Sequence, residues 1–148
     1  MKKSILTIAL GFIIAINSAF AGTTEGVNQK VINGFKKDYS TATDVRWEIS
    51  KDYYKATFTN AEQVLYAYYN AEGARIAVMR NVRSNQLPLK VSEDLRKHQD
   101  GRWITDLFEF SSQEESGYYA TLENAEEKVV LKSTDGSSWI VFSKEEKK

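Results

Sequence analysis

The sequence predicts an α+β fold: two tandem helix-plus-four-strand repeats form one antiparallel sheet with the helices on one face. Two observations predict this. A nine-residue segment recurs 64 residues later, and in each copy a helical pattern of apolar residues precedes strand-like runs. The chain has 148 residues, 42% of them hydrophobic, which suffices for one domain with a substantial core.

The amino-terminal segment resembles a cleaved export signal. Met1-Lys2-Lys3 supplies positive charge, Ile5 to Ile16 is an apolar run, and Ala19-Phe20-Ala21 has small residues where signal peptidase requires them. We expect cleavage after Ala21, so that 1–21 is the signal peptide and 22–148 the mature domain; an uncleaved membrane anchor is the alternative. The chain contains no cysteine, which excludes disulfides and a lipid-anchored precursor. These features favour a periplasmic or secreted protein.

The repeated segment defines the two units. The first copy reads Tyr54-Lys-Ala-Thr-Phe-Thr-Asn-Ala-Glu62 and the second Tyr118-Tyr-Ala-Thr-Leu-Glu-Asn-Ala-Glu126, with six of nine positions identical. A tryptophan precedes each copy, Trp47 and Trp103, and an acidic residue followed by glycine closes each unit's next turn. The first repeat therefore covers about 25–84 and the second about 85–143.

Each unit begins with a helix. Val27, Val31 and Phe35 recur at helical spacing in the first unit. In the second, Val91 and Leu95 follow a proline suited to a first helical turn, and Asp100-Gly101 ends the helix. The runs that follow are rich in β-branched and aromatic residues and predict strands. They are 53–59, 64–69 and 74–80 in the first unit and 104–110, 117–122, 128–132 and 138–142 in the second.

The order of these motifs resembles a known family. Asp44-Val-Arg-Trp47, Tyr54-Lys-Ala-Thr-Phe58, Tyr69-Asn-Ala-Glu-Gly73 and then Leu87-Pro88 opening a second copy are similar to the PepSY-like domains of periplasmic proteins, also called β-lactamase-inhibitor-like (BLIP-like) proteins. The resemblance covers roughly 27–142. It implies one continuous sheet with helices on one side and a concave open face on the other. The chain lacks the cysteines of the secreted inhibitor, and inhibition of a β-lactamase is not carried over.

Alternation along the strands assigns residues to the two faces. We expect positions that are apolar in both copies to face the helices: Tyr54/Tyr118, Ala56/Ala120, Phe58/Leu122, Leu65/Val129, Ala67/Leu131, Ile76/Trp139 and Val78/Val141, joined by Trp47 and Trp103. The opposite parity gives the candidate partner-binding residues Tyr53, Lys55, Tyr66, Tyr68, Arg75, Phe108, Phe110 and Tyr119, with Met79, Lys132, Ile140 and Phe142 on the same face.

Composition and motifs exclude several functions. Lys+Arg and Asp+Glu both number 20, without the basic cluster that nucleic-acid binding needs. His98 is the only histidine, so no ordinary zinc site is expected. The sequence has no HExxH, GxSxG, P-loop, GxGxxG or EF-hand motif. A two-carboxylate hydrolase is the alternative left open, although nothing in the sequence selects a pair of carboxylates. We therefore expect no catalytic residues, no metal and no cofactor.

The aromatic and cationic open face favours a non-enzymatic module that contacts a protein or peptide, because Tyr, Phe, Met and Arg are enriched at interfaces. Two alternatives for the face remain open: cross-strand aromatic pairs that only stabilise the sheet, and homodimer packing. A small-ligand carrier, which needs an enclosed pocket, and a self-associating envelope protein are the alternative functions. No stable membrane insertion is expected after cleavage.

Overall fold

The computed structural model describes residues 24–148. The predicted signal segment and the cleavage site after Ala21 lie outside these residues. The described chain contains two α-helices and eight strands, in the order α1 (Gln29–Asp38), β1 (Thr43–Ile49), β2 (Tyr54–Asn60), β3 (Gln63–Tyr69), β4 (Arg75–Asn81), α2 (Leu89–Gln99), β5 (Trp103–Ser112), β6 (Ser116–Glu123), β7 (Glu127–Ser133) and β8 (Ile140–Glu146), with a short 3-10 helix, Ser84–Gln86, before α2.

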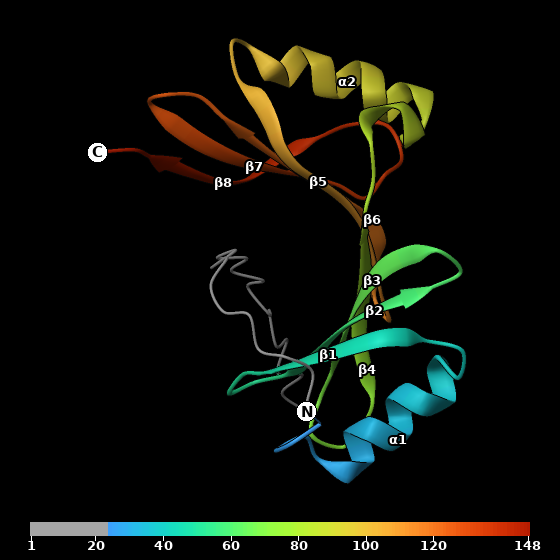
Figure 1. Ribbon diagram of the computed structural model, residues 1–148. Coiled ribbons are helices and arrows are strands. Elements are labelled where there is room, and N and C mark those ends of the chain that lie inside the picture. Colours follow the sequence, from blue (N-terminus) through green and yellow to red (C-terminus); the bar gives the residue numbers. More distant parts are fainter. Residues whose placement is uncertain (1–23) are drawn as a thin grey trace, which may run out of the picture.

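The eight strands form one antiparallel sheet in sequence order, β1 to β8. The sheet is strongly curved, and the two helices lie outside its two arms, α1 against the first four strands and α2 against the last four (Figure 1). We call the face opposite the helices the concave face. The predicted α+β class and the helix-plus-four-strand repeats are confirmed.

Close backbone approach fixes α1 on the sheet. The helix begins after Asn28, whose side chain accepts a hydrogen bond from the Lys30 amide, and it buries Val31 and Phe35. A Cβ atom built on Gly34 would lie 2.1 Å from the carbonyl oxygen of Gly73, in the β3–β4 turn. Position 34 therefore requires glycine because any larger side chain would collide with the turn, and not because the backbone there has a positive φ.

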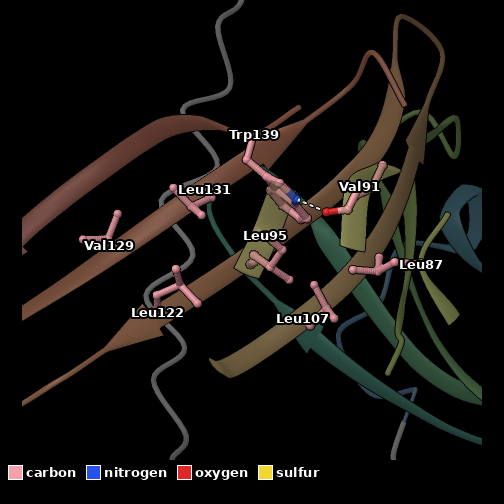
Figure 2. Close-up of a cluster of buried hydrophobic side chains, with 9 residues drawn as sticks. Leu87, Val91, Leu95, Leu107, Leu122, Val129, Leu131 and Trp139 are labelled. Carbon is pink, nitrogen blue, oxygen red and sulfur yellow. Dashed lines mark hydrogen bonds between the residues drawn. The ribbon is translucent and has the colours of Figure 1, made fainter. Parts of the chain in front are cut away.

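A polar anchor fixes α2 instead. Pro88 is the N-cap, one position earlier than the first helical turn, and Asp100 ends the helix at a positive φ of 36°. The indole Nε1 of Trp139 donates a 2.9 Å hydrogen bond to the carbonyl oxygen of Val91 (Figure 2). The Trp139 amide donates another, also 2.9 Å, to Asp94 Oδ2. The residue just before β8 is thereby joined to α2.

Each helix covers its own hydrophobic core. The core under α1 contains Val27, Val31, Phe35, Ala56, Phe58, Ala67 and Tyr69. The core under α2 contains Leu87, Val91, Leu95, Leu107, Ala120, Leu122, Val129, Leu131 and Trp139 (Figure 2). The predicted pairs Ala56/Ala120, Phe58/Leu122 and Ala67/Leu131 are buried in these cores, at 0 or 1% exposure. Strand alternation therefore assigned the central positions of both units correctly.

The prediction that both tryptophans join the core is right for one and wrong for the other. Trp47 packs edge-on against Phe35, with ring centroids 5.3 Å apart. Trp103 is 58% exposed. In the ladders Trp47 lies opposite Ala56, whereas the residue opposite Ala120 is Leu107. Leu107 is thus the structural counterpart of Trp47, and Trp103 lies four residues farther from the centre of a longer strand.

Three more assignments are wrong, two of them because the β3–β4 register shifts and the third because its residue is exposed at the sheet edge. The ladder between β3 and β4 shifts after Tyr68, so that Arg75 lies opposite the buried Tyr69 on the helix side. Arg75, predicted on the open face, donates to the Tyr39 hydroxyl at 3.0 Å. Ile76, predicted under the helices, packs against the cluster on the concave face. Val141, also predicted in the core, is 58% exposed on the edge strand β8.

Candidate functional site

The concave face carries a third cluster of buried side chains, which we call the concave cluster: Tyr68, Ala77, Met79, Phe108, Phe110 and Tyr119, with Tyr66, Ile76 and Val130 packed against it. Cross-strand register brings these residues together, because Tyr66 lies opposite Met79 and Met79 opposite Phe110. Tyr119 lies 5.4 Å from Phe108 and 4.9 Å from Phe110, measured between ring centroids. The cluster therefore joins the two repeats across β4 and β5.

Lys132 lies among the aromatic rings of this cluster. Its ammonium is 5.6 Å from the ring centroids of Phe110 and Tyr119 and 5.9 Å from that of Phe142. It also pairs with Glu115 from the β5–β6 turn. Burial acts to lower the pKa of Lys132, but the hydrogen bond and charge of Glu115 raise it overall. The lysine is therefore charged at neutral pH.

A second lysine occupies the related place in the first unit. Lys55 Nζ lies 3.2 Å from Glu48 Oε1 and 5.3 Å from the ring centroid of Tyr66. Lys55 is opposite Tyr68 across β2 and β3, and Tyr119 is opposite Lys132 across β6 and β7. Both repeats thus contain a lysine opposite a tyrosine at the same place in the ladder. In the first repeat the lysine is on the earlier strand of the pair, and in the second it is on the later strand.

The cluster divides into a floor and a rim. Phe108, Phe110 and Tyr119 are 5 or 6% exposed and form the floor together with Tyr68 and Met79. Burial raises the pKa of the Tyr68 and Tyr119 hydroxyls, so both stay protonated at neutral pH. The rim is accessible: Tyr53 is 37%, Phe142 41% and Ile140 62% exposed. Tyr53 contacts Tyr68 and Phe142 contacts Tyr119, which links rim to floor.

The concave face brings together seven of the eight candidate residues, namely Tyr53, Lys55, Tyr66, Tyr68, Phe108, Phe110 and Tyr119. Arg75 lies on the other side of the sheet, against the end of α1. Sequence reasoning missed the carboxylates Glu48 and Glu115, which partner the two lysines. Hairpin register could have indicated Glu48, since it lies directly opposite Lys55.

A hollow of about 410 Å³ lies between the two units, where β4 ends and the chain diverges from β5. One wall is the chain leaving β4, Asn81, Val82, Arg83 and Ser84; the other is β5, Ile104, Thr105, Asp106 and Leu107. Burial raises the pKa of the Asp106 carboxyl, although the Leu107 amide and Lys128 oppose this. We call this hollow the seam notch. Asn81 lies opposite Phe108, so the notch adjoins the floor of the concave cluster.

Residues 24–148 contain no group of three or more His, Cys, Asp or Glu side chains placed to hold a metal ion. None of the helices in this part of the chain is long and apolar enough to cross a membrane.

Comparison with solved structures shows the same fold. A BLIP-like protein from Bacteroides fragilis matches with a TM-score of 0.67 at 17% identity, covering 87% of this chain and 89% of its own. A DUF2874 family protein from Bacteroides ovatus matches at 0.70 and 19% identity, covering 85% and 89%. A protein from Bacteroides eggerthii, described provisionally as periplasmic, matches at 0.70 and 15%, covering 80% and 87%.

No protein-family model matches the chain, and no curated protein sequence matches it. The structural matches establish the BLIP-like architecture; the PepSY-like part of the resemblance stays a prediction.

Proposed function

We propose that the chain is a non-enzymatic binding module of the periplasm that contacts a protein or peptide through the rim of its concave face. The observation that carries this proposal is the aromatic and methionine cluster on the face without helices, flanked by Lys55 and Lys132. Tyrosine, phenylalanine and methionine are over-represented at interface centres, and desolvated anchors supply most of the binding energy there. The provisional periplasmic description of a similar structure and the signal-like segment support the location.

The rim supplies the contacts in this proposal, and the floor supports them. Tyr53, Ile140 and Phe142 are exposed, and two of them rest on buried rings of the floor. Such anchors lose little side-chain entropy on binding because their supports already restrict them. The paired lysines bring a carboxylate each, so the face presents balanced charge instead of a basic patch.

A small-ligand carrier is less well supported. Two hollows of the described chain, of about 410 and 290 Å³, are both open to solvent. Carriers of apolar molecules need an enclosed pocket that buries most of the ligand.

Affinity capture from periplasmic extract tests the proposal. The mature protein and a variant with Tyr53→Ala and Phe142→Ala are used in parallel, with Leu89→Ala as a control, because Leu89 is 74% exposed on α2. The proposal expects a stoichiometric partner that the control retains and the double variant loses. A partner bound equally by all three proteins would contradict the assignment of the face.

A further inference from the structure

The seam notch contains a length of strand with a free edge inside the sheet. The β4–β5 ladder runs from Ala77 opposite Ser112 to Asn81 opposite Phe108. The strand β5 begins five residues earlier, at Trp103, and this first part is paired only with β6. Among the described residues, one main-chain hydrogen bond joins the chain after β4 to this part of β5: the Val82 amide donates to the Leu107 carbonyl oxygen at 3.0 Å.

Strand edges in the middle of a sheet are normally paired, because unpaired amides and carbonyls bind other extended chains. The pairing of this part of β5 with β6 shifts register between Ile104 and Asp106, so Thr105 is an extra residue there. A hollow of about 410 Å³ borders the part of β5 that β4 leaves unpaired. The notch therefore has both the hydrogen-bonding edge and the space that an added strand requires.

The side chains around the edge define what would fit. Val82, Ile104 and Leu107 give the notch apolar lining, and Asn81, Ser84 and Thr105 give it neutral polar groups. Asp106 adds a carboxyl group, which accepts a hydrogen bond from the Leu107 amide. Arg83 is exposed, and no ion pair is found for it among residues 24–148. A guanidinium is the preferred partner of a carboxylate, because two parallel hydrogen bonds match its geometry.

We propose that the seam notch binds an extended peptide segment, which adds as a strand to the edge of β5 at Trp103–Asp106 and places a carboxylate against Arg83. This mode uses main-chain hydrogen bonds for affinity and alternate side-chain contacts for selectivity. Four residues of added strand span about 13 Å. The inference rests on the proposed function, since it names the part of a partner that the concave face would receive beside Phe108.

The test uses the mature protein, labelled with ¹⁵N, and a synthetic peptide, acetyl-Thr-Val-Thr-Val-Thr-Glu-amide. Two companion peptides replace both valines by proline or the glutamate by lysine. The proposal expects the first peptide to shift the amide signals of 82–84 and 103–107 and to slow hydrogen exchange in 104–107. The proline peptide should not do so, because proline lacks the amide hydrogen that a strand donates. Equal shifts with the proline peptide, or shifts confined to other residues, would overturn the proposal.

Charge exchange tests the role of Arg83. Arg83→Glu should weaken binding of the glutamate peptide at least tenfold and strengthen binding of the lysine peptide, whereas Arg96→Glu, an exposed change on α2, should alter neither. Unchanged affinities in Arg83→Glu would refute the carboxylate contact. Failure here is separable from failure of the proposed function: a captured partner that depends on Tyr53 and Phe142 but ignores the peptides and Arg83 would leave the concave rim as the site without the strand addition.

Discussion

The indole nitrogen of Trp139 and the carbonyl oxygen of Val91 form a buried hydrogen bond of 2.9 Å that joins β8 to α2. In the first unit Tyr69 joins the sheet to the helix in the same way, because its hydroxyl donates a 2.9 Å hydrogen bond to Asp38 Oδ2 at the end of α1. The two residues are not counterparts in the repeat. The register places Tyr69 opposite Tyr54 and Ser133 opposite Tyr118, so a serine holds the position of Tyr69 in the second unit. In the second unit the aromatic side chain that bonds to the helix is instead Trp139, the residue just before β8.

The two tryptophans of the second unit give a matched test of this anchor. Trp139→Phe keeps a ring in the core but removes the indole hydrogen bond to the Val91 carbonyl, and we expect a loss of about 0.5–1.5 kcal/mol in the free energy of unfolding. Trp139→Ala should cost about 3–5 kcal/mol. Trp103→Ala, at a residue 58% exposed, should stay within about 0.5 kcal/mol. Urea denaturation of the three variants measures this, and a similar loss at both tryptophans would contradict the burial pattern.

Ser133 offers a change in the opposite direction. It is 2% exposed, and its hydroxyl oxygen has no hydrogen-bond partner among the described residues. A buried hydroxyl without a partner is destabilising relative to a methyl group of similar shape. We expect Ser133→Ala to leave stability unchanged or raise it by up to about 1 kcal/mol in urea denaturation. A loss above that range would indicate that the hydroxyl is bonded in solution, for example to water.

The sequence was sufficient for the architecture and for the central core positions, because those follow from periodicity alone. Phe58 and Leu122 hold equal places in the two ladders and are both buried. Trp103 was misplaced because β5 is ten residues long and shifts register between Ile104 and Asp106, whereas β1 has seven residues. A bulge changes the face of every residue beyond it, and nothing in the local sequence marks where it falls.

Acid should weaken the attachment of α2 through Asp94. The Trp139 amide holds the pKa of this carboxyl below its usual range; burial opposes the effect, and Lys97 and His98 reinforce it. Because the folded-state pKa is lower than the unfolded-state value, the contribution to stability is complete above about pH 5 and is lost as pH falls through the folded-state pKa. We expect the urea midpoint to fall below pH 5, and to fall less steeply in Asp94→Asn. Asp52→Asn, an exposed change in the β1–β2 turn, should retain the steep dependence; identical pH curves for all three proteins would contradict the role of Asp94.

Replacing Gly34 by alanine tests whether the close contact with the β3–β4 turn outweighs the higher helix propensity of alanine. At an unobstructed helical position, replacing glycine by alanine stabilises a helix by about 1 kcal/mol. Here the added Cβ atom would lie 2.1 Å from the Gly73 carbonyl oxygen, which belongs to the main chain of a tight turn. We therefore expect Gly34→Ala to lower the melting temperature and to cost about 3 kcal/mol. Asn33→Ala on the exposed face of the same helix is the control, and a stabilised Gly34→Ala protein would show that α1 sits farther from the turn.

Strand alternation, which predicted the central core positions, also predicted part of the candidate site. Parity correctly gathered Tyr66, Phe110 and Tyr119 on one face, but it could not separate floor from rim, because burial there depends on the curvature of the sheet. Parity also failed at Arg75, just past the register shift beside Tyr68. An open sheet face can thus bury its central side chains against one another, and exposure has to be read from the structure.

Two phenylalanines of the concave face separate its stability from its binding. Phe110 is 5% exposed and Phe142 is 41% exposed, although both rings lie against Tyr119 and near Lys132. Phe110→Ala should cost about 3–5 kcal/mol of stability as a core truncation. The same reasoning raises the cost expected for Tyr119→Ala above the roughly 1 kcal/mol that an exposed cross-strand pair would give. Phe142→Ala should cost no more than about 1 kcal/mol, since its ring remains largely in water.

The same Phe142→Ala variant should weaken binding of the captured partner by about 2 kcal/mol, roughly thirtyfold, if the rim supplies an anchor. Thermal unfolding and the dissociation constant are measured on each variant, with Leu89→Ala as the control for both. A stable Phe142→Ala protein with undiminished affinity would place the partner elsewhere on the molecule. Equal destabilisation by Phe110→Ala and Phe142→Ala would instead show that the rim is part of the core, and that the aromatic face serves to hold the two repeats together.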